Sequence, residues 1–271
     1  RRLPLKGSVA FGAAVEMAEP SGLKIKSYGA TDLGRRRQVN EDAYLCDDEL
    51  GLWVVADGMG GHAAGEVASQ EAVDTVYGMV KRGKRTLDLE GAFSEEKARA
   101  AARMLEGAVQ AATYMVFAMA ELDTNKAGMG TTLSTMMGMG DVAVLAQVGD
   151  SRIYRVRGGE ASQLTEDHTL IAWQLKQGLI TAEEAKHSRH RNVITRAVGN
   201  RDYVQVDTHW VELEVGDQFL LCSDGLHGYV RTEEIPQVTD LGGEACVRKL
   251  IEIANGRGGR DNITAVLVEV T

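Results

Sequence analysis

Three apolar stretches of this chain each run into an aspartate that has a glycine beside it. The aspartates are Asp57, Asp150 and Asp224, and a fourth, Asp261, precedes the apolar run Ile263–Val270. A buried strand fixes the position of its own end, and glycine lets the backbone turn sharply and leaves its carbonyl accessible. Four aspartates placed in this way could converge on one rim of a sheet sandwich.

Such a convergence would predict a metal centre. Carboxylates at close range raise one another's pKa unless a cation lies among them. Mg²⁺ and Mn²⁺ prefer oxygen ligands of this kind together with several waters. Two such ions about 3.5–4 Å apart can hold a hydroxide and polarise a phosphoryl oxygen. The alternative for any single Asp-Gly pair is an ordinary turn: Asp150 could cap the corner that follows it, and Asp261 could be a loop residue.

A second group of candidates lies at Arg35–Arg37 and at the acidic pair Glu41 and Asp42. We expect Arg35 and Arg36 to be solvated surface residues. An arginine that faces the carboxylates would have a clear use, because a guanidinium group grips phosphate bidentately. Glu41 and Asp42 would add further acidic groups at the same rim.

A glycine-rich loop, Gly58–His62, follows Asp57 and leads into a helical stretch. The loop lacks the Gly-Lys-Ser/Thr ending of a phosphate-binding P-loop and the spacing of a dinucleotide fingerprint. His62 could act as a general acid or contact a substrate. It could equally be a helix-entry histidine bonded to the backbone, and the residues alone leave both interpretations open.

Short apolar or alternating runs predict a strand-rich chain joined by tight turns, so that neighbouring strands are antiparallel. The expected strands are Lys24–Thr31, Asp42–Asp47, Leu52–Asp57, Thr131–Met137, Val142–Val148, Arg152–Val156, Val204–Val211, Gln218–Cys222 and Ile263–Val270. Positive-φ glycines suit the hairpin at Gly158-Gly159. The expected helices are Gly65–Lys81, Glu95–Glu121 after an N-cap at Ser94, Thr169–Gln177, one opened by a capping box at Thr181 and Glu184, and Glu244–Ala254. Together they predict an α+β fold in which helices cover the outer faces of a pair of sheets.

Composition excludes several classes of protein. The chain has 271 residues, 44% of them hydrophobic, and 39 Asp and Glu against 30 Lys and Arg give a net charge of −9. Such acidity argues against a nucleic-acid partner, which favours basic surfaces. Three widely spaced cysteines form neither a disulfide framework nor a zinc site, which suits a cytoplasmic protein. No apolar run is long enough for a membrane span. We expect residues 1–22 to be a flexible leader and residues 23–271 to form one domain.

The order of these motifs resembles the metal-dependent serine/threonine phosphatases of type 2C, the PPM family, and above all its bacterial branch. The resemblance covers roughly residues 23–270. It is carried by Arg37…Asn40-Glu41-Asp42, Asp57-Gly58-Met59-Gly60-Gly61-His62, Gly130-Thr131-Thr132, Gly149-Asp150-Ser151-Arg152, Leu164-Thr165-Glu166-Asp167-His168, Asn192…Thr195-Arg196-Ala197-Val198-Gly199, Ser223-Asp224-Gly225-Leu226 and Gly259-Arg260-Asp261-Asn262.

The resemblance implies a four-layer αββα arrangement, an antiparallel β-sandwich with two helices on each outer face, and a Mg²⁺ or Mn²⁺ centre at one edge. It implies that Asp57 bridges two ions, that the Gly58 carbonyl binds the second, and that Asp224 and Asp261 complete the first. A third ion would be held by Asp150 with Asp224. Further roles by resemblance are Glu41 and Asp42 acting through water, phosphate binding by Arg37, and a flap at about residues 164–195 in which Asp167 is an extra contact for the third ion. His62 matches the Gly-Gly-His position of the bacterial branch.

The function implied is hydrolysis of phosphoserine and phosphothreonine in proteins by a metal-bridging hydroxide, opposing a bacterial Ser/Thr kinase. Arg37, His62 and Asp42 are the expected catalytic residues, and Arg37 and His62 would also contact the substrate. The expected form is a monomer. Two alternatives stay open: a non-catalytic regulator that binds phosphoproteins on the same fold, and a two-metal hydrolase of phosphodiesters or nucleotides. The net acidity counts against a nucleic-acid substrate for the latter.

Overall fold

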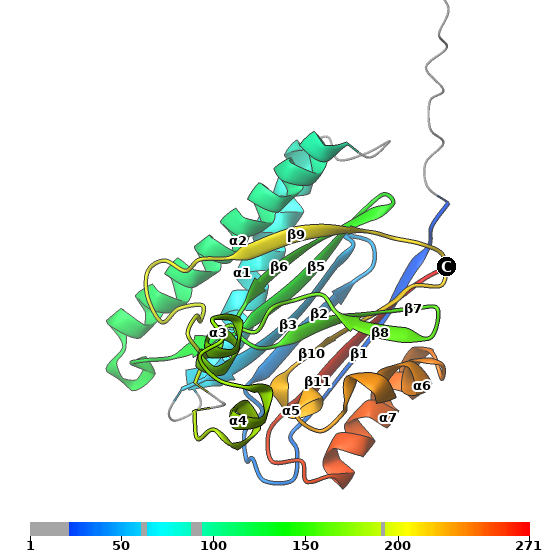
Figure 1. Ribbon diagram of the computed structural model, residues 1–271. Coiled ribbons are helices and arrows are strands. Elements are labelled where there is room, and N and C mark those ends of the chain that lie inside the picture. Colours follow the sequence, from blue (N-terminus) through cyan, green and yellow to red (C-terminus); the bar gives the residue numbers. More distant parts are fainter. Residues whose placement is uncertain (1–21, 61–63, 88–93, 191–192) are drawn as a thin grey trace, which may run out of the picture.

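Two antiparallel sheets stacked face to face form the centre of the protein (Figure 1). The computed structural model describes residues 22–60, 64–87, 94–190 and 193–271. The first sheet has the order β1 (Ile25–Asp32), β11 (Ile263–Val270), β10 (Gln218–Cys222), β7 (Arg152–Arg157) and β8 (Glu160–Gln163). The second has the order β2 (Asp42–Asp47), β3 (Leu52–Met59), β5 (Leu133–Met139), β6 (Val142–Val148) and β9 (Asp207–Glu212), and β4 (Gly130–Thr131) pairs with the end of β3.

The strands are apolar on both faces because both faces are covered. Along β3, Trp53 and Val55 lie in the core between the two sheets, together with Phe219 of β10. The alternate residues Val54 and Ala56 belong to the core beneath the helices. This is why β3 has a continuous apolar run rather than a polar face.

Helices form the two outer layers, as predicted (Figure 1). The long helices α1 (Ala64–Thr86) and α2 (Glu95–Leu122) cover the second sheet. The first sheet is covered by α7 (Gly243–Gly256) and the short α6 (Ile235–Thr239). The fold is therefore α+β with four layers, although one of the two helices on the α7 side has only five residues.

The helix caps follow the sequence. The Ser94 side chain accepts a hydrogen bond from the Lys97 amide at the start of α2, as expected of an N-cap. On α2 the apolar residues Leu105, Ala108, Val109, Ala112 and Val116 are buried at a spacing of three and four residues, whereas Met115 and Leu122 are exposed. None of the helices in the part of the chain that the structure describes is long and apolar enough to cross a membrane.

Short elements account for most differences from the predicted boundaries. The 164–195 segment contains α3 (Leu170–Lys176) and α4 (Ala182–His187), and the predicted capping box is present at Thr181. The predicted hairpin at Gly158-Gly159 is also confirmed, with φ of 60° and 80°, and β8 follows it. Elements that were not predicted are α5 (Asp224–His227), α6, β8 and the 3₁₀ turns Thr124–Lys126 and Thr232–Glu234.

Two strand predictions were wrong in detail. Residues 204–206 do not belong to β9, because the backbone N–H and carbonyl of Val204 bond to the Gln110 side chain on α2 rather than to a neighbouring strand. The strand predicted over Thr131–Met137 is interrupted at Thr132, whose backbone N–H donates to the Asp57 carbonyl and whose hydroxyl accepts from the Asp57 amide. That interruption lies beside the candidate site.

Candidate metal centre

Antiparallel pairing brings the predicted acidic residues to one edge of the sandwich. In such a pair the end of one strand lies beside the start of the next. Asp42, the first residue of β2, therefore lies directly opposite Asp57 near the end of β3. Asp224 follows the end of β10, and Asp261 precedes the start of the neighbouring strand β11. Asp150 follows β6, where the chain crosses from the second sheet to β7 in the first.

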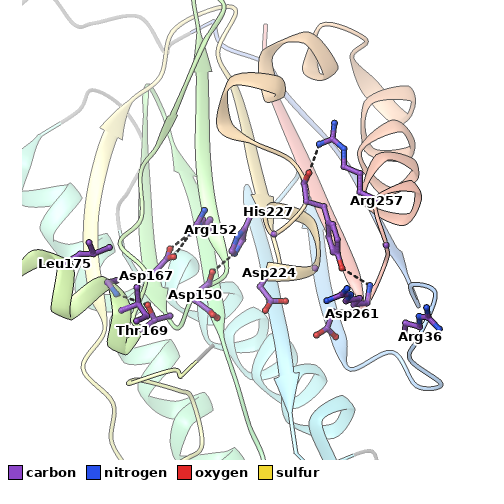
Figure 2. A pocket seen from close by; sticks show the side chains of 17 residues that line it. Arg36, Asp150, Arg152, Asp167, Thr169, Leu175, Asp224, His227, Arg257 and Asp261 are labelled. Carbon is purple, nitrogen blue, oxygen red and sulfur yellow. Dashed lines mark hydrogen bonds and ion pairs between the residues drawn. The ribbon is translucent and has the colours of Figure 1, made fainter. Parts of the chain in front are cut away.

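Glycines allow the close approach of these segments. A Cβ atom on Gly225 would lie 1.8 Å from the Asn262 carbonyl oxygen, and one on Gly58 would lie 2.1 Å from the Gly65 oxygen. Both distances are shorter than any side chain permits. Gly225 thus lets Asp224 lie next to Asp261, and Gly58 lets the end of β3 pass the start of α1. Asp150, Asp224 and Asp261 line one cavity of about 790 Å³. Figure 2 shows these side chains from close by.

The carboxyl groups are in an environment that opposes their ionisation. Burial, and then the neighbouring carboxylates, raise the pKa of Asp42 to about 7 and that of Asp150 to about 7. The pKa of Asp57 is raised well above its usual range by burial and by the charges of Asp42 and Asp224. The pKa of Asp224 is also raised by burial and by Asp261. These residues would need a compensating cation to be ionised together at neutral pH.

The donor set fits a hard divalent cation. The Asp42 Oδ1 atom is buried and has no hydrogen-bond partner, although Oδ2 accepts hydrogen bonds from Ser223 and Thr264. An unpartnered buried oxygen within a cluster of carboxylates is what a metal ion or its waters would satisfy. No group of three or more Asp, Glu, His or Cys side chains that could hold a metal ion is found among the described residues. An ion at this edge would therefore need water and backbone oxygen ligands as well, which Mg²⁺ and Mn²⁺ accept.

Arg37 is the predicted arginine that faces the carboxylates. Its guanidinium group donates to Asp261 at 2.9 Å and to Glu41 at 3.3 Å. The Glu41 side chain is 12% exposed, and burial raises its pKa even though Arg37 opposes that rise. Arg35 and Arg36 are exposed, as expected. The structure thus brings Arg37, Glu41, Asp42, Asp57, Gly58, Asp150, Asp224 and Asp261 together, whereas His62 lies outside the described residues.

Sequence reasoning missed the residues that hold these acids in place. The Asn262 side chain accepts from the Glu41 amide at 2.9 Å and donates to the carbonyls of Leu33 and Val39. It thereby attaches residues 33–41, which we call the arginine loop, to the start of β11. The hydroxyls of Ser223 and Thr264 orient Asp42. The signal available in the sequence was a polar residue next to three of the strand-end aspartates: Ser151 beside Asp150, Ser223 beside Asp224 and Asn262 beside Asp261.

The first part of the 164–195 segment, from Asp167 to Leu175, lies against the same edge of the sandwich. Asp167 is the predicted extra contact for a third ion. Both of its carboxylate oxygens accept hydrogen bonds from the Arg152 guanidinium group, at 2.9 Å and 2.6 Å. A role toward an ion would require that ion pair to rearrange. Buried His168 accepts from the Gly149 amide through Nδ1, and its Nε2 lies 3.0 Å from Asp207. His227, which we did not expect at the site, has its Nε2 at 2.9 Å from the Asp150 carbonyl oxygen, and burial lowers its pKa to about 4.

The raised pKa values of Asp42 and Asp150 give a pH-dependent prediction. Both groups bind protons in the folded, metal-free protein up to about pH 7, whereas unfolded aspartates lose theirs near pH 4. The stability they contribute is therefore present at low pH and is lost as pH rises from about 4 through 7. We expect excess Mn²⁺ to raise the melting temperature more at about pH 8 than at about pH 5. Each kcal/mol by which ion binding stabilises the folded state should raise the melting temperature by about 2–4 °C.

Thermal unfolding with Mn²⁺ and with chelator at both pH values tests this. The Asp42→Asn variant is the control, because it removes one of the titrating groups and should weaken the pH dependence in chelator. An equal Mn²⁺ effect at both pH values would contradict the prediction.

The protein is a helix-covered β-sandwich with buried carboxylates and an arginine at the ends of its strands. This combination of fold and site indicates a metal-dependent hydrolase. The profile of the family described as Protein phosphatase 2C matches residues 32–267. The chain is 38% identical over 252 residues to the serine/threonine phosphatase stp of Listeria innocua, covering 88% of this chain and 93% of the relative.

Comparison with solved structures indicates the same family. The Mycobacterium tuberculosis serine/threonine phosphatase PstP/Ppp superposes with a TM-score of 0.80 at 34% identity, covering 90% of this chain and 98% of that one. The catalytic domain of PstP in complex with two manganese ions superposes with a TM-score of 0.79 at 34% identity, covering 92% and 99%. This chain therefore belongs to the protein phosphatase 2C family and is a protein phosphatase.

Proposed function

We propose that the protein hydrolyses phosphoserine and phosphothreonine in other proteins with the help of Mn²⁺ or Mg²⁺, and that it opposes a Ser/Thr kinase. One observation carries the proposal: the carboxyl groups of Asp42, Asp57, Asp150 and Asp224 share one buried edge where their ionisation needs cations. Kinase and phosphatase act on the same side chains, so the partners would be phosphorylated proteins and a kinase. Three free cysteines suit a reducing cytoplasm, where we place the activity.

The acidic residues would bind the ions and their waters. Asp57, the Gly58 carbonyl, Asp224 and Asp261 would hold two ions, and Asp150 with Asp224 would hold a third. Glu41 and Asp42 would accept hydrogen bonds from the waters around these ions. When bound, the ions would supply a hydroxide nucleophile and polarise the phosphoryl oxygens.

Arg37 would bind the phosphoryl group. In this structure its guanidinium group is shared between Asp261 and Glu41. When Asp261 serves as a metal ligand, Arg37 would be free to donate in parallel to two phosphoryl oxygens. His62 would contact the substrate or protonate the leaving serine or threonine oxygen.

A direct assay tests the proposed function. We expect phosphothreonine and phosphoserine peptides to release phosphate in Mn²⁺, and the release to stop in excess chelator and return when Mn²⁺ is restored. A phosphotyrosine peptide of the same sequence measures residue selectivity. Tight binding of the phosphopeptides with no phosphate release would instead indicate a non-catalytic regulator.

Replacing Arg37 by lysine should lower kcat/KM for an aryl phosphate by about 10- to 100-fold. Lysine keeps the charge but cannot present two parallel N–H groups to phosphate. Steady-state kinetics in saturating Mn²⁺ measure the loss, which should be largest in KM. The matched control is Arg35→Lys, since Arg35 is exposed and has no ion pair within the described residues. Equal kinetics for the two variants would contradict a phosphate-binding role for Arg37.

A further inference from the structure

The cavity beside the carboxylates has two chemically different walls. One wall comes from α3 and includes the apolar residues Ile171, Ala172 and Leu175. The other comes from the loop before β11 and the arginine loop, and includes Arg36 and Arg260. In Figure 2, Leu175 and Arg36 lie at opposite sides of the cavity, with Asp150 and Asp224 between them. A peptide chain lying across the carboxylates would therefore meet different chemistry on its two sides.

Two of the arginines that line this cavity already have acidic partners. Arg152 is paired with Asp167 at 2.6 Å, and Arg257 is paired with Glu234 at 2.7 Å. Arg36 and Arg260 are exposed and have no acidic partner within the described ranges. We call these two residues the arginine pair.

The backbone holds the arginine pair in one place. Its members come from two loops that are bonded to each other, because the Arg35 amide donates to the Gly259 carbonyl at 2.6 Å. The Arg260 amide donates to the Tyr229 hydroxyl, which anchors the second loop. A side chain on Gly34 would meet the Asp261 carbonyl oxygen at 2.1 Å, so glycine lets the first loop lie against the second. Two arginine side chains that have no acidic partner among the described residues thus extend from bonded loops beside the acidic edge of a protein whose net charge is −9.

We propose that the arginine pair binds an anionic group of the substrate chain that flanks the phosphorylated residue. This rests on the proposed function and adds a substrate class to it: phosphopeptides with an acidic side chain, or a second phosphorylated residue, on one side of the residue that is hydrolysed. The phosphoryl group that reacts lies over the carboxylates near Arg37, so the arginine pair serves a different anion. The apolar wall receives uncharged side chains on the opposite side of the peptide.

The test compares peptides that share one phosphothreonine. A charge is placed about three residues before or after it, since three extended residues span about 10 Å. The variable position carries alanine, glutamate, arginine or a non-hydrolysable phosphonate that stands for a second phosphate. For the wild-type protein we expect kcat/KM to be about fivefold higher with glutamate than with alanine on one side of the phosphothreonine, higher still with the phosphonate, and lowest with arginine.

Variants assign the preference to the arginine pair. In Arg36→Gln with Arg260→Gln, the ratio of kcat/KM for the glutamate peptide to that for the alanine peptide should fall to about one, and each single variant should lose part of it. The ratio is taken within each variant, so a general loss of activity cancels. Arg35→Gln is the matched control and should keep the wild-type ratio. Raising the salt from about 0.1 M to 1 M should also reduce the ratio, because the screening length falls from about 10 Å to 3 Å.

The outcomes separate this proposal from the proposed function. Equal kcat/KM for all peptides, or a preference that survives in the double variant, would overturn the arginine pair while leaving the phosphatase activity standing. A preference for the phosphonate alone would identify a second phosphate as the natural anion. No hydrolysis of any peptide or of an aryl phosphate in Mn²⁺ would overturn the proposed function itself.

Discussion

Asp224→Asn should lower kcat/KM by about a thousandfold or more while leaving the metal-free fold at least as stable as the wild type. Asparagine keeps the shape of the side chain and removes one charge. Asp224 would ligate ions that stabilise the transition state by several kcal/mol. Because each 1.36 kcal/mol is a factor of ten in rate, a loss of about 4 kcal/mol lowers kcat/KM about a thousandfold. The stability expectation comes from the pKa of Asp224, which burial and Asp261 raise, so that a neutral residue relieves repulsion.

This prediction is specific because Asp224→Asn should lower the activity without lowering the stability of the metal-free fold. The measurements are kcat/KM for an aryl phosphate over a Mn²⁺ titration, and thermal unfolding in chelator. The matched control is Asp141→Asn, an exposed aspartate next to a glycine in the β5–β6 turn, at the other end of β6 from Asp150. Activity within tenfold of the wild type would exclude Asp224 from the metal site, and a lower melting temperature in chelator would show that its role is structural.

Sequence patterns were sufficient for the elements that carry strong local signals. The continuous apolar run of β3, the N-cap at Ser94 and the paired glycines at Gly158-Gly159 are all present as predicted. The missed helix α5 is four residues long and begins at Asp224 itself, where a strand-end turn was expected. A helix of one turn has no periodicity to detect, and its position is set by contact with the start of β11.

The candidate site was predictable in composition but not in its distances. Repeated strand-end aspartates indicated Asp57, Asp150, Asp224 and Asp261, and antiparallel pairing then placed them at one edge. Residue type alone does not separate Arg37 from Arg35 and Arg36; the family resemblance indicated Arg37, and its contacts with Asp261 and Glu41 show that it faces the carboxylates. Asn262 was visible in the sequence, but its three contacts to the arginine loop depend on tertiary structure.

Gly225→Ala should have the second large effect, because the position has no space for a side chain. The added Cβ would lie 1.8 Å from the Asn262 oxygen and 3.4 Å from the Asp261 Cβ. The contact is with backbone, so α5 must move away from β11 and carry Asp224 with it. A displacement of about 1 Å at a reacting centre can cost about a hundredfold in rate, and forced overpacking costs about 1–3 kcal/mol of stability.

We therefore expect kcat/KM to fall about a hundredfold, the Mn²⁺ concentration for half-maximal activity to rise, and the melting temperature to drop by about 2–12 °C. The matched control is Gly107→Ala on α2, where the added Cβ meets no heavy atom within 4 Å. That change should raise stability by about 0.5–1 kcal/mol, as alanine does in a helix, and leave the kinetics unchanged. Wild-type Mn²⁺ dependence in Gly225→Ala would contradict the prediction, because it would mean that Asp224 can move relative to Asp261 without any effect on the ions. Glycine at position 225 would then serve only the packing of α5 against β11.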